Sequence, residues 1–265
     1  MRTLKIKGYA LVTGASQGLG KAFAVELAKK GFNLILVALP GKPFDDLKCS
    51  SELDGVETHF IETDLSVESH VRQLASEVNQ KFELQLLINN AGLGGSCGYV
   101  DVNPDKIVNM INVNVTAMAL LTRLLLPNLL KRKSYILNVS SMAAFSPMGY
   151  KTVYPATKAF VHHFTRGLYQ ELRHTSVFVS VVNPGPMATN SDIIERIKLQ
   201  GWRAKIGLMS PEKVASIAIR KLFKRDTLIM LGWANGLNWV MLRFIPIWIR
   251  LPLLTHAIKR ELKST

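Results

Sequence analysis

Tyr154 and Lys158 are the two residues whose types and spacing most directly suggest chemistry. They lie four positions apart in the stretch Y-P-A-T-K, so on a helix the phenol and the ammonium share one face. A phenol with a pKa of about 10 is a weak base at neutral pH, and a nearby positive charge favours its ionised form. Such a pair could carry a proton to or from a carbonyl oxygen, although the same spacing also occurs on ordinary solvated helix faces.

A glycine-rich turn near the N-terminus has the context of a phosphate-binding turn. The apolar run 9–12 predicts a buried strand, and a helical pattern of apolar residues follows at 23–28. Between them the glycines follow G-x-x-x-G-x-G, which lets the backbone approach a pyrophosphate at the helix N-terminus. A glycine turn without a ligand is the alternative. The residues expected to contact a cofactor here are Gly14, Ser16, Gln17, Gly18, Leu19 and Gly20.

Polar and small residues also follow two further predicted strands. The run 84–89 ends in Asn89-Asn90-Ala91-Gly92, and the run 133–140 is closed by Ser140 and Ser141. Asn114 lies between these strands, in the stretch N-V-N-V-T. Because the ends of parallel strands meet at one edge of a sheet, these residues are candidates for one site.

Together these motifs resemble the short-chain dehydrogenase/reductase family over about residues 8–231. Asn114 and Ser141 precede Tyr154 by forty and thirteen residues, as is usual in that family. The resemblance implies that Ser141 bonds the substrate carbonyl and Tyr154 supplies the proton as hydride arrives. It implies that Lys158 lowers the pKa of Tyr154 and holds the nicotinamide ribose, and that Asn114 positions a water linking Lys158 to solvent. A helix-interior amide for Asn114 and a turn cap for Ser141 are the alternatives.

The resemblance also implies further cofactor contacts. Tyr154, Lys158 and the segment Asn90, Ala91 and Gly92 are expected to contact the cofactor. Pro184, Gly185 and Thr189 resemble the P-G loop of the family and the Thr that follows it. Asp64 matches the acid after the third strand that bonds the adenine amino group, and a surface Asp that caps the next helix is its alternative.

The end of the second predicted strand bears on the choice between NADP and NAD. Relatives that use NAD place an acid there to bond the ribose, whereas NADP requires an uncharged position with a cation nearby. Residues 38–42 read Ala-Leu-Pro-Gly-Lys, without a carboxylate. NADP(H) is therefore favoured, with NAD(H) as the alternative, and Ser16 and Lys42 are the candidate contacts of the 2′-phosphate.

The stretch 140–164 is most similar to the branch of long-chain 3-ketoacyl and steroid reductases. It implies reduction of a ketone, or oxidation of the alcohol, on a hydrophobic, lipid-like or acyl-thioester substrate. Met142, Phe145, Met148 and Tyr150 could line an apolar pocket or belong to the core. The competing hypothesis is a dinucleotide-binding regulator or a membrane-attached scaffold with little turnover, but such a protein has no physical need for all four catalytic residues.

The order of apolar runs predicts the fold. Strands are expected near 8–13, 33–38, 56–61, 84–89, 133–140, 177–183 and 227–231, with helices between them. This alternation predicts one doubly wound α/β Rossmann domain over 1–265, with a seven-stranded parallel sheet. Cys49 and Cys97 have no metal-ligand or redox spacing and are expected to be free thiols. Residues 1–7 lack the apolar segment of a secretory signal, so we expect a cytoplasmic protein. We also expect it to be a homo-oligomer.

The C-terminal seventy residues combine positive charge with tryptophan. Residues 196–265 contain fourteen Lys and Arg against three Asp and Glu, and all four tryptophans, at 202, 233, 239 and 248. The uncharged run 227–242 has sixteen residues, fewer than the roughly twenty that span a bilayer. We expect 232–265 to be an apolar, basic helical extension that acts as a lid, a subunit interface or a membrane-surface contact. Nucleic-acid binding is disfavoured, because no readout element accompanies the charge.

Overall fold

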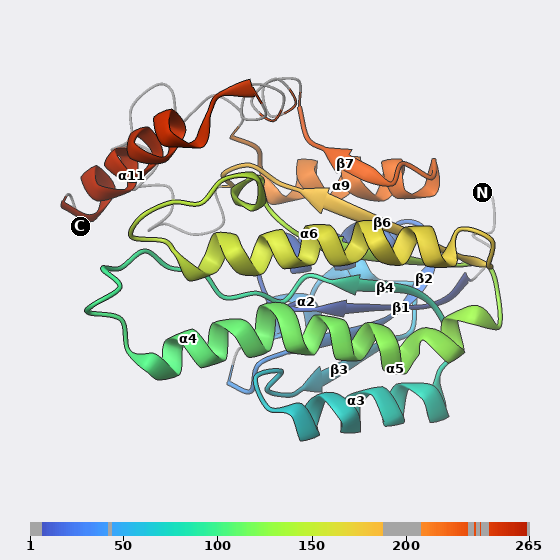
Figure 1. Ribbon diagram of the computed structural model, residues 1–265. Coiled ribbons are helices and arrows are strands. Elements are labelled where there is room, and N and C mark those ends of the chain that lie inside the picture. The colour runs from blue at the N-terminus through green and yellow to red at the C-terminus, as the bar shows by residue number, and fades with distance from the viewer. Residues whose placement is uncertain are drawn as a thin grey trace.

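Seven parallel strands form one sheet in the order β3-β2-β1-β4-β5-β6-β7 (Figure 1). The computed structural model describes residues 7–41, 44–187, 208–232, 236, 239 and 244–263. The expected strands are all present, each within two residues of its predicted ends. The direction in which successive strands are added to the sheet reverses between β1 and β4. The strands are β1 (Lys7–Thr13), β2 (Phe32–Ala38), β3 (Thr58–Glu62), β4 (Leu84–Asn89), β5 (Ser134–Val139), β6 (Val177–Asn183) and β7 (Leu228–Met230).

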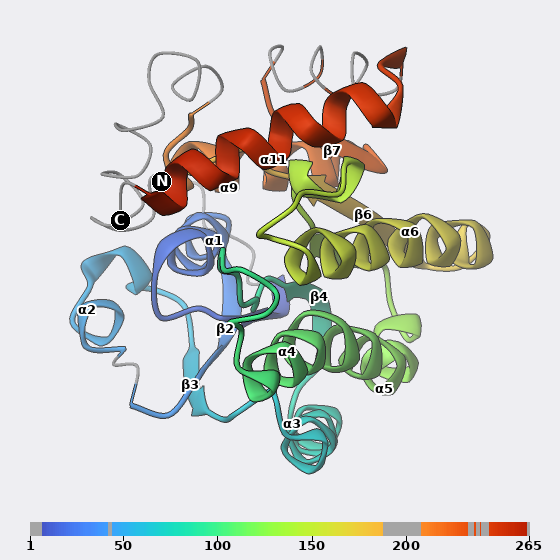
Figure 2. The ribbon, with the colours of Figure 1, turned by 60° about the vertical axis from the view of Figure 1, so that its left-hand side comes forward.

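Helices cover both faces of this sheet, as the doubly wound fold requires (Figure 2). On one face α1 (Gly18–Ala28) and α9 (Pro211–Phe223) pack over a fully apolar core. On the other, α3 (Glu68–Lys81), α5 (Met118–Leu130) and α6 (Val153–Leu172) do the same. Short α2 (Asp45–Lys48) and η1 (Ser51–Leu53) join β2 to β3. Because both faces are buried, the strands read as continuous apolar runs rather than as alternating patterns.

A continuous helical segment, 104–130, includes α4 (Pro104–Ile111), the π-helical turn η2 (Asn112–Ala117) and α5. It is long and apolar enough to cross a membrane, and 44% of its most apolar window is buried inside the protein. Leu121, Leu125 and Leu129 are among its residues in the core shared with α3 and the sheet. The apolar character of this segment is therefore explained by its packing as a core helix.

The C-terminal helix α11 (Ile247–Lys263) confirms the expected helical extension. Figure 2 shows it crossing the molecule above the edge at which the strands end. The Arg250 guanidinium donates to the Phe145 carbonyl at 3.3 Å, and the Lys259 ammonium lies 5.9 Å from the Tyr150 ring centroid. The extension is thus fastened to the loop that leads into α6.

Candidate active site at the carboxyl edge of the sheet

The turn between β1 and α1 has the backbone that a pyrophosphate requires. Gly14 and Gly18 have φ of +65° and +54°, in the left-handed region that disfavours side chains. A Cβ added to Gly20 would lie 1.9 Å from the Gly14 carbonyl oxygen, so only glycine fits there. The N-cap residue Gln17 forms no side-chain capping bond with the described residues, which leaves the helix N-terminus available to an anion. These residues fit a dinucleotide cofactor.

Thr13 and Asn90 fasten the loop after β4 to this turn. The Thr13 hydroxyl accepts hydrogen bonds from the N–H groups of Asn90 and Ala91, each at 3.0 Å. The Asn90 side-chain amide donates to the carbonyls of Thr13 and Gly14, at 2.9 and 3.2 Å. The Asn90 amide nitrogen therefore shapes the turn, and the contact of Asn90 with the cofactor stays a prediction. The bracing role of Thr13 depends on a contact between segments that are distant in the sequence.

Tyr154, Ser141 and Lys158 meet at the carboxyl end of β5, as the sequence predicted. Tyr154 and Lys158 belong to the N-terminal half of α6, and the Lys158 Nζ lies 5.9 Å from the Tyr154 ring centroid. The same ammonium is buried and donates to the Val139 carbonyl at 2.9 Å. Ser141 is hydrogen-bonded to Tyr154. Its oxygen also accepts from the Ala143 N–H at 3.1 Å as the cap of η3 (Met142–Phe145), so the capping interaction considered from the sequence is present as well.

Burial controls the ionisation of Tyr154 and Lys158. It raises the pKa of the Tyr154 phenol above its usual value of 10, and the hydrogen bond with Ser141 acts weakly in the opposite direction. Burial lowers the pKa of Lys158 from 10.5 to about 8. The sequence expectation of a Tyr154 pKa lowered by Lys158 therefore differs from the structure, in which loss of solvation is the largest influence on the phenol. A phenol that stays protonated at neutral pH is suited to donate a proton.

Asn114 lies in the π-helical turn η2 and joins three segments of the site. Its amide nitrogen donates to the Leu93 carbonyl at 2.8 Å and to the Thr157 hydroxyl at 3.0 Å. Its amide oxygen accepts from the Leu93 N–H at 2.7 Å. Thr157 in turn donates to the Tyr154 carbonyl at 2.8 Å. A π-helical turn often marks a functional position, and here it connects the loop after β4 to the helix that carries Tyr154.

Thr157 is a residue of this site that the sequence did not single out, and for Ser140 the sequence predicted the place but not the contact. Thr157 lies within Y-P-A-T-K, and its position three residues after Tyr154 was the only available signal. Ser140 is buried and donates from its hydroxyl to the Lys158 carbonyl at 2.7 Å. Both roles depend on contacts between segments that are distant in the sequence.

The remaining expected cofactor contacts are placed as follows. Asp64 Oδ1 accepts from the Ser66 N–H at 2.8 Å, which forms a turn ahead of α3, but the N-cap of α3 is Val67, so Asp64 does not cap that helix. The Pro184 carbonyl accepts from the Met142 N–H at 2.9 Å, which holds the loop containing Gly185 beside η3. Lys42 and Thr189 lie outside the described residues.

A pocket of about 360 Å³ opens beside Tyr154. Its walls are the loop after β4, the first turns of α4 and the segment 150–154. Of the four apolar residues considered for the pocket, only Tyr150 lines it. Met142 is buried, and the Phe145 ring packs edge-on against His162 and Trp239.

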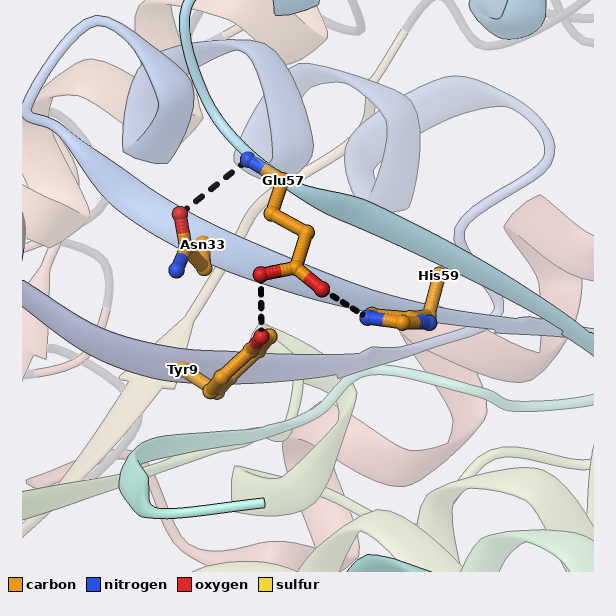
Figure 3. Close-up of polar contacts among 4 residues, drawn as sticks. All are labelled: Tyr9, Asn33, Glu57 and His59. Carbon is orange, nitrogen blue, oxygen red and sulfur yellow. Dashed lines mark hydrogen bonds and ion pairs between the residues drawn. The ribbon is translucent and has the colours of Figure 1, made fainter. Parts of the chain in front are cut away.

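A second polar cluster lies at the opposite, amino edge of the sheet (Figure 3). Tyr9 donates to Glu57 Oε2 at 2.5 Å, and the His59 ring contacts Glu57 Oε1 at 2.8 Å. Asn33 Oδ1 accepts from the Glu57 N–H at 3.1 Å. Burial, with the bond to Glu57, raises the pKa of Tyr9 to about 12, and the bonds from Tyr9 and His59 lower the pKa of Glu57. The cluster links β1, β2 and β3 away from Tyr154, and we assign it a structural role.

Comparisons with known proteins agree with this geometry. The family model for short chain dehydrogenases matches residues 8–198. Hydroxysteroid dehydrogenase-like protein 1 of Gallus gallus is 33% identical over 247 residues, which are 91% of this chain and 73% of that protein. Very-long-chain 3-oxoacyl-CoA reductase of Anas platyrhynchos is 37% identical over 194 residues, 71% of this chain and 62% of that protein.

The chain therefore spans less than two thirds of that reductase. Among solved structures, a short-chain dehydrogenase from Sphingobium yanoikuyae in complex with NADPH has a TM-score of 0.76 and 26% identity. The alignment covers 89% of this chain and 92% of that protein.

Proposed function

Since the chain belongs to the short-chain dehydrogenase family and is an NAD(P)-dependent oxidoreductase, we propose that it uses NADPH to reduce a ketone on a hydrophobic, lipid-like or acyl-thioester substrate. The observation that carries the proposal is the meeting of Tyr154, Ser141 and Lys158 beside a mostly apolar pocket. The relatives named as a hydroxysteroid dehydrogenase-like protein and a very-long-chain 3-oxoacyl-CoA reductase support the substrate class.

The reaction adds a hydride to the carbonyl carbon and a proton to the carbonyl oxygen. A bound nicotinamide supplies the hydride. Ser141 donates a hydrogen bond to the carbonyl oxygen, and Tyr154 gives it the proton as negative charge develops there. Because burial raises the pKa of Tyr154, the phenol is protonated at neutral pH and can donate its proton in the reductive step. Lys158 places a positive charge beside the phenolate that remains.

The preference for NADP(H) rests on the end of β2. Ala38, the last residue of β2, is buried, and Leu39 after it is 47% exposed, where an acid would bond the ribose of NAD. The glycine turn would hold the pyrophosphate, with Ser16 beside it and Lys42 near the 2′-phosphate. Lys158, Asn114 and the loop 90–92 would line the nicotinamide end.

We further propose that the outer face of α11 contacts an anionic membrane surface. Phe244, Trp248 and Leu253 are 80%, 73% and 66% exposed. His256, Lys259 and Arg260, farther along the helix, are also exposed, and Lys259 in addition lies 5.9 Å from the Tyr150 ring centroid. Exposed apolar side chains near basic residues are typical of a helix that lies at the lipid head groups. The inner face of α11 holds the pocket loop, so the lid and membrane alternatives are compatible. The homo-oligomer stays a prediction.

The decisive experiment is NADPH oxidation with ketones of increasing chain length, followed by identification of the alcohol. Long-chain ketones should be reduced faster than short ones, and Tyr154→Phe should lower the rate by about a thousandfold or more while leaving NADPH binding nearly unchanged. Binding of NADPH without turnover of any ketone would instead favour the dinucleotide-binding scaffold. Reduction at a normal rate by Tyr154→Phe would exclude the proton-donor role.

A further inference from the structure

The pocket beside Tyr154 has a charge that the proposed reaction does not use. Its lining contains apolar side chains from the loop after β4, α4 and the segment before α6. Two lining residues are charged, Lys106 and Lys151, and both are cationic. Asp101 and Asp105 belong to the same stretch of chain, but neither lines the pocket.

The two ammonium groups come from different walls. Lys151 precedes Tyr154 by three residues, and its Nζ lies 5.5 Å from the centroid of the Tyr154 ring. Lys106 lies in the first turn of α4 and is exposed. Lys106 forms no ion pair with any residue in the described part of the chain. A ligand that enters the pocket therefore meets two cationic lining residues, one from α4 and one from the segment before α6.

The position of Lys106 is unfavourable for the helix itself. A cation in the first turn lies near the positive end of the helix dipole, where acids are preferred. An anion bound beside Lys106 would be stabilised by the ammonium, whereas the helix terminus itself is already capped by Asn103 and carries Asp105 in its first turn. The charge arrangement of the pocket thus complements an anionic group on a ligand that is otherwise apolar.

We propose that Lys106 and Lys151 bind an anionic group, a carboxylate or a phosphate, on the ketone substrate. This inference rests on the proposed function, because it assigns the polar end of the same substrate. The apolar lining takes the hydrocarbon part, and the two lysines select among ketones by charge. Lys106 is the specificity residue that can be tested without disturbing Tyr154, since the cations placed over the Tyr154 ring are Lys151 and Lys158.

The test uses three ketones with the same chain and the same keto position, ending in a methyl, a carboxylate or a phosphate. The measured quantity is kcat/KM for each charged ketone divided by kcat/KM for the neutral one. We expect a ratio of about ten or more in the unmodified protein, since a charge-assisted contact contributes about that factor. Lys106→Gln should reduce the ratio severalfold, and Lys106→Glu should bring it below one. The larger of the two ratios identifies carboxylate or phosphate as the preferred group.

Lys133→Gln is the matched control, because Lys133 is also exposed but belongs to the turn before β5. Equal kcat/KM for charged and neutral ketones, or equal effects of Lys106→Gln and Lys133→Gln, would overturn the proposal. So would a Lys106→Gln variant that loses NADPH affinity and keeps its ketone selectivity, because Lys106 would then serve the cofactor.

Calorimetric binding of the same ketones to Tyr154→Phe separates this inference from the proposed function. The anionic ketones should bind about tenfold more tightly than the neutral one, and Lys106→Gln and Lys151→Gln should each reduce that difference. If no ketone is reduced by the unmodified protein but the anionic ones bind tightly, the reductase proposal fails and the anion site stands. If ketones are reduced at rates that do not depend on their charge, the reductase proposal stands and the anion site fails.

Discussion

The N–H of Gly149 donates a hydrogen bond to Thr255 Oγ1 at 3.0 Å, although the two residues are separated by 106 positions in the chain. This contact ties α11 to the loop immediately before Tyr154. The next residue, Tyr150, has a φ of +61°, and its carbonyl accepts from the Cys97 N–H at 2.8 Å. Tyr150 and Cys97 both line the pocket. The C-terminal helix therefore supports a wall of the pocket from behind.

The close approach of Gly149 to α11 predicts a large effect from a single methyl group. A Cβ on Gly149 would lie 2.6 Å from Thr255 Cγ2, so Gly149→Ala must displace the loop or the helix. We expect a loss of about 1–3 kcal/mol in the free energy of unfolding and a lower kcat/KM. Gly167→Ala, at an exposed position of α6 with nothing near the added atom, should leave activity unchanged. Adding Thr255→Ala to Gly149→Ala should recover part of the loss, and strict additivity in denaturant unfolding would contradict the contact.

Lys158 should make stability depend on pH in a defined window. Its pKa is about 8 in the folded protein and about 10.5 when exposed, so between these values the unfolded chain binds more protons. The free energy of unfolding should therefore rise with pH, by roughly 1–2 kcal/mol from pH 8 to about 9.5. Below about pH 7 the ammonium is charged in both states and contributes no slope. In Lys158→Met the rise should be absent, as measured by urea unfolding, and both turnover and NADPH affinity should fall.

Cofactor preference should respond to a carboxylate placed after β2. Unmodified protein should bind NADPH more tightly than NADH, and Leu39→Asp should reverse that order by repelling the 2′-phosphate and bonding the 2′-hydroxyl. Leu39 is the position to change, because Ala38 is only 3% exposed and an acid there would be buried. Leu130→Asp, at a similarly exposed leucine of α5, is the control. Tighter binding of NADH by the unmodified protein in a fluorescence titration would refute the NADP assignment.

The outer face of α11 should bind anionic vesicles. Cosedimentation is expected at low salt and should weaken as salt rises, since screening shortens the reach of charge to about 8 Å near physiological ionic strength. Trp248→Ala combined with Leu253→Ala should abolish it. Phe160→Ala, on an exposed aromatic residue of α6, should not. This face is a subunit interface if the unmodified protein does not cosediment with vesicles and is an oligomer in gel filtration, while the double variant elutes as a smaller species.

The sequence alone predicted the strands, their parallel order and the residues that converge on the site. Apolar runs of strand length alternate with helical patterns, and the positive φ of Gly14 and Gly18 follows from local motif geometry. The place of Ser141 was predictable because strand ends in a parallel sheet share an edge, and the family resemblance predicted that Tyr154 and Lys158 join it.

Tertiary structure decided what depends on packing between distant segments. It raised the pKa of Tyr154, because desolvation is set by everything that surrounds the phenol and not by the neighbour four residues away. In the folded protein Asn90 and Asn114 hold neighbouring loops in place by hydrogen bonds. Lys106, forty-eight positions before Tyr154, lines the pocket beside Tyr154. The fold also fastens Thr255 to Gly149. No local pattern encodes such contacts, since they form only when the sheet and its covering helices are assembled.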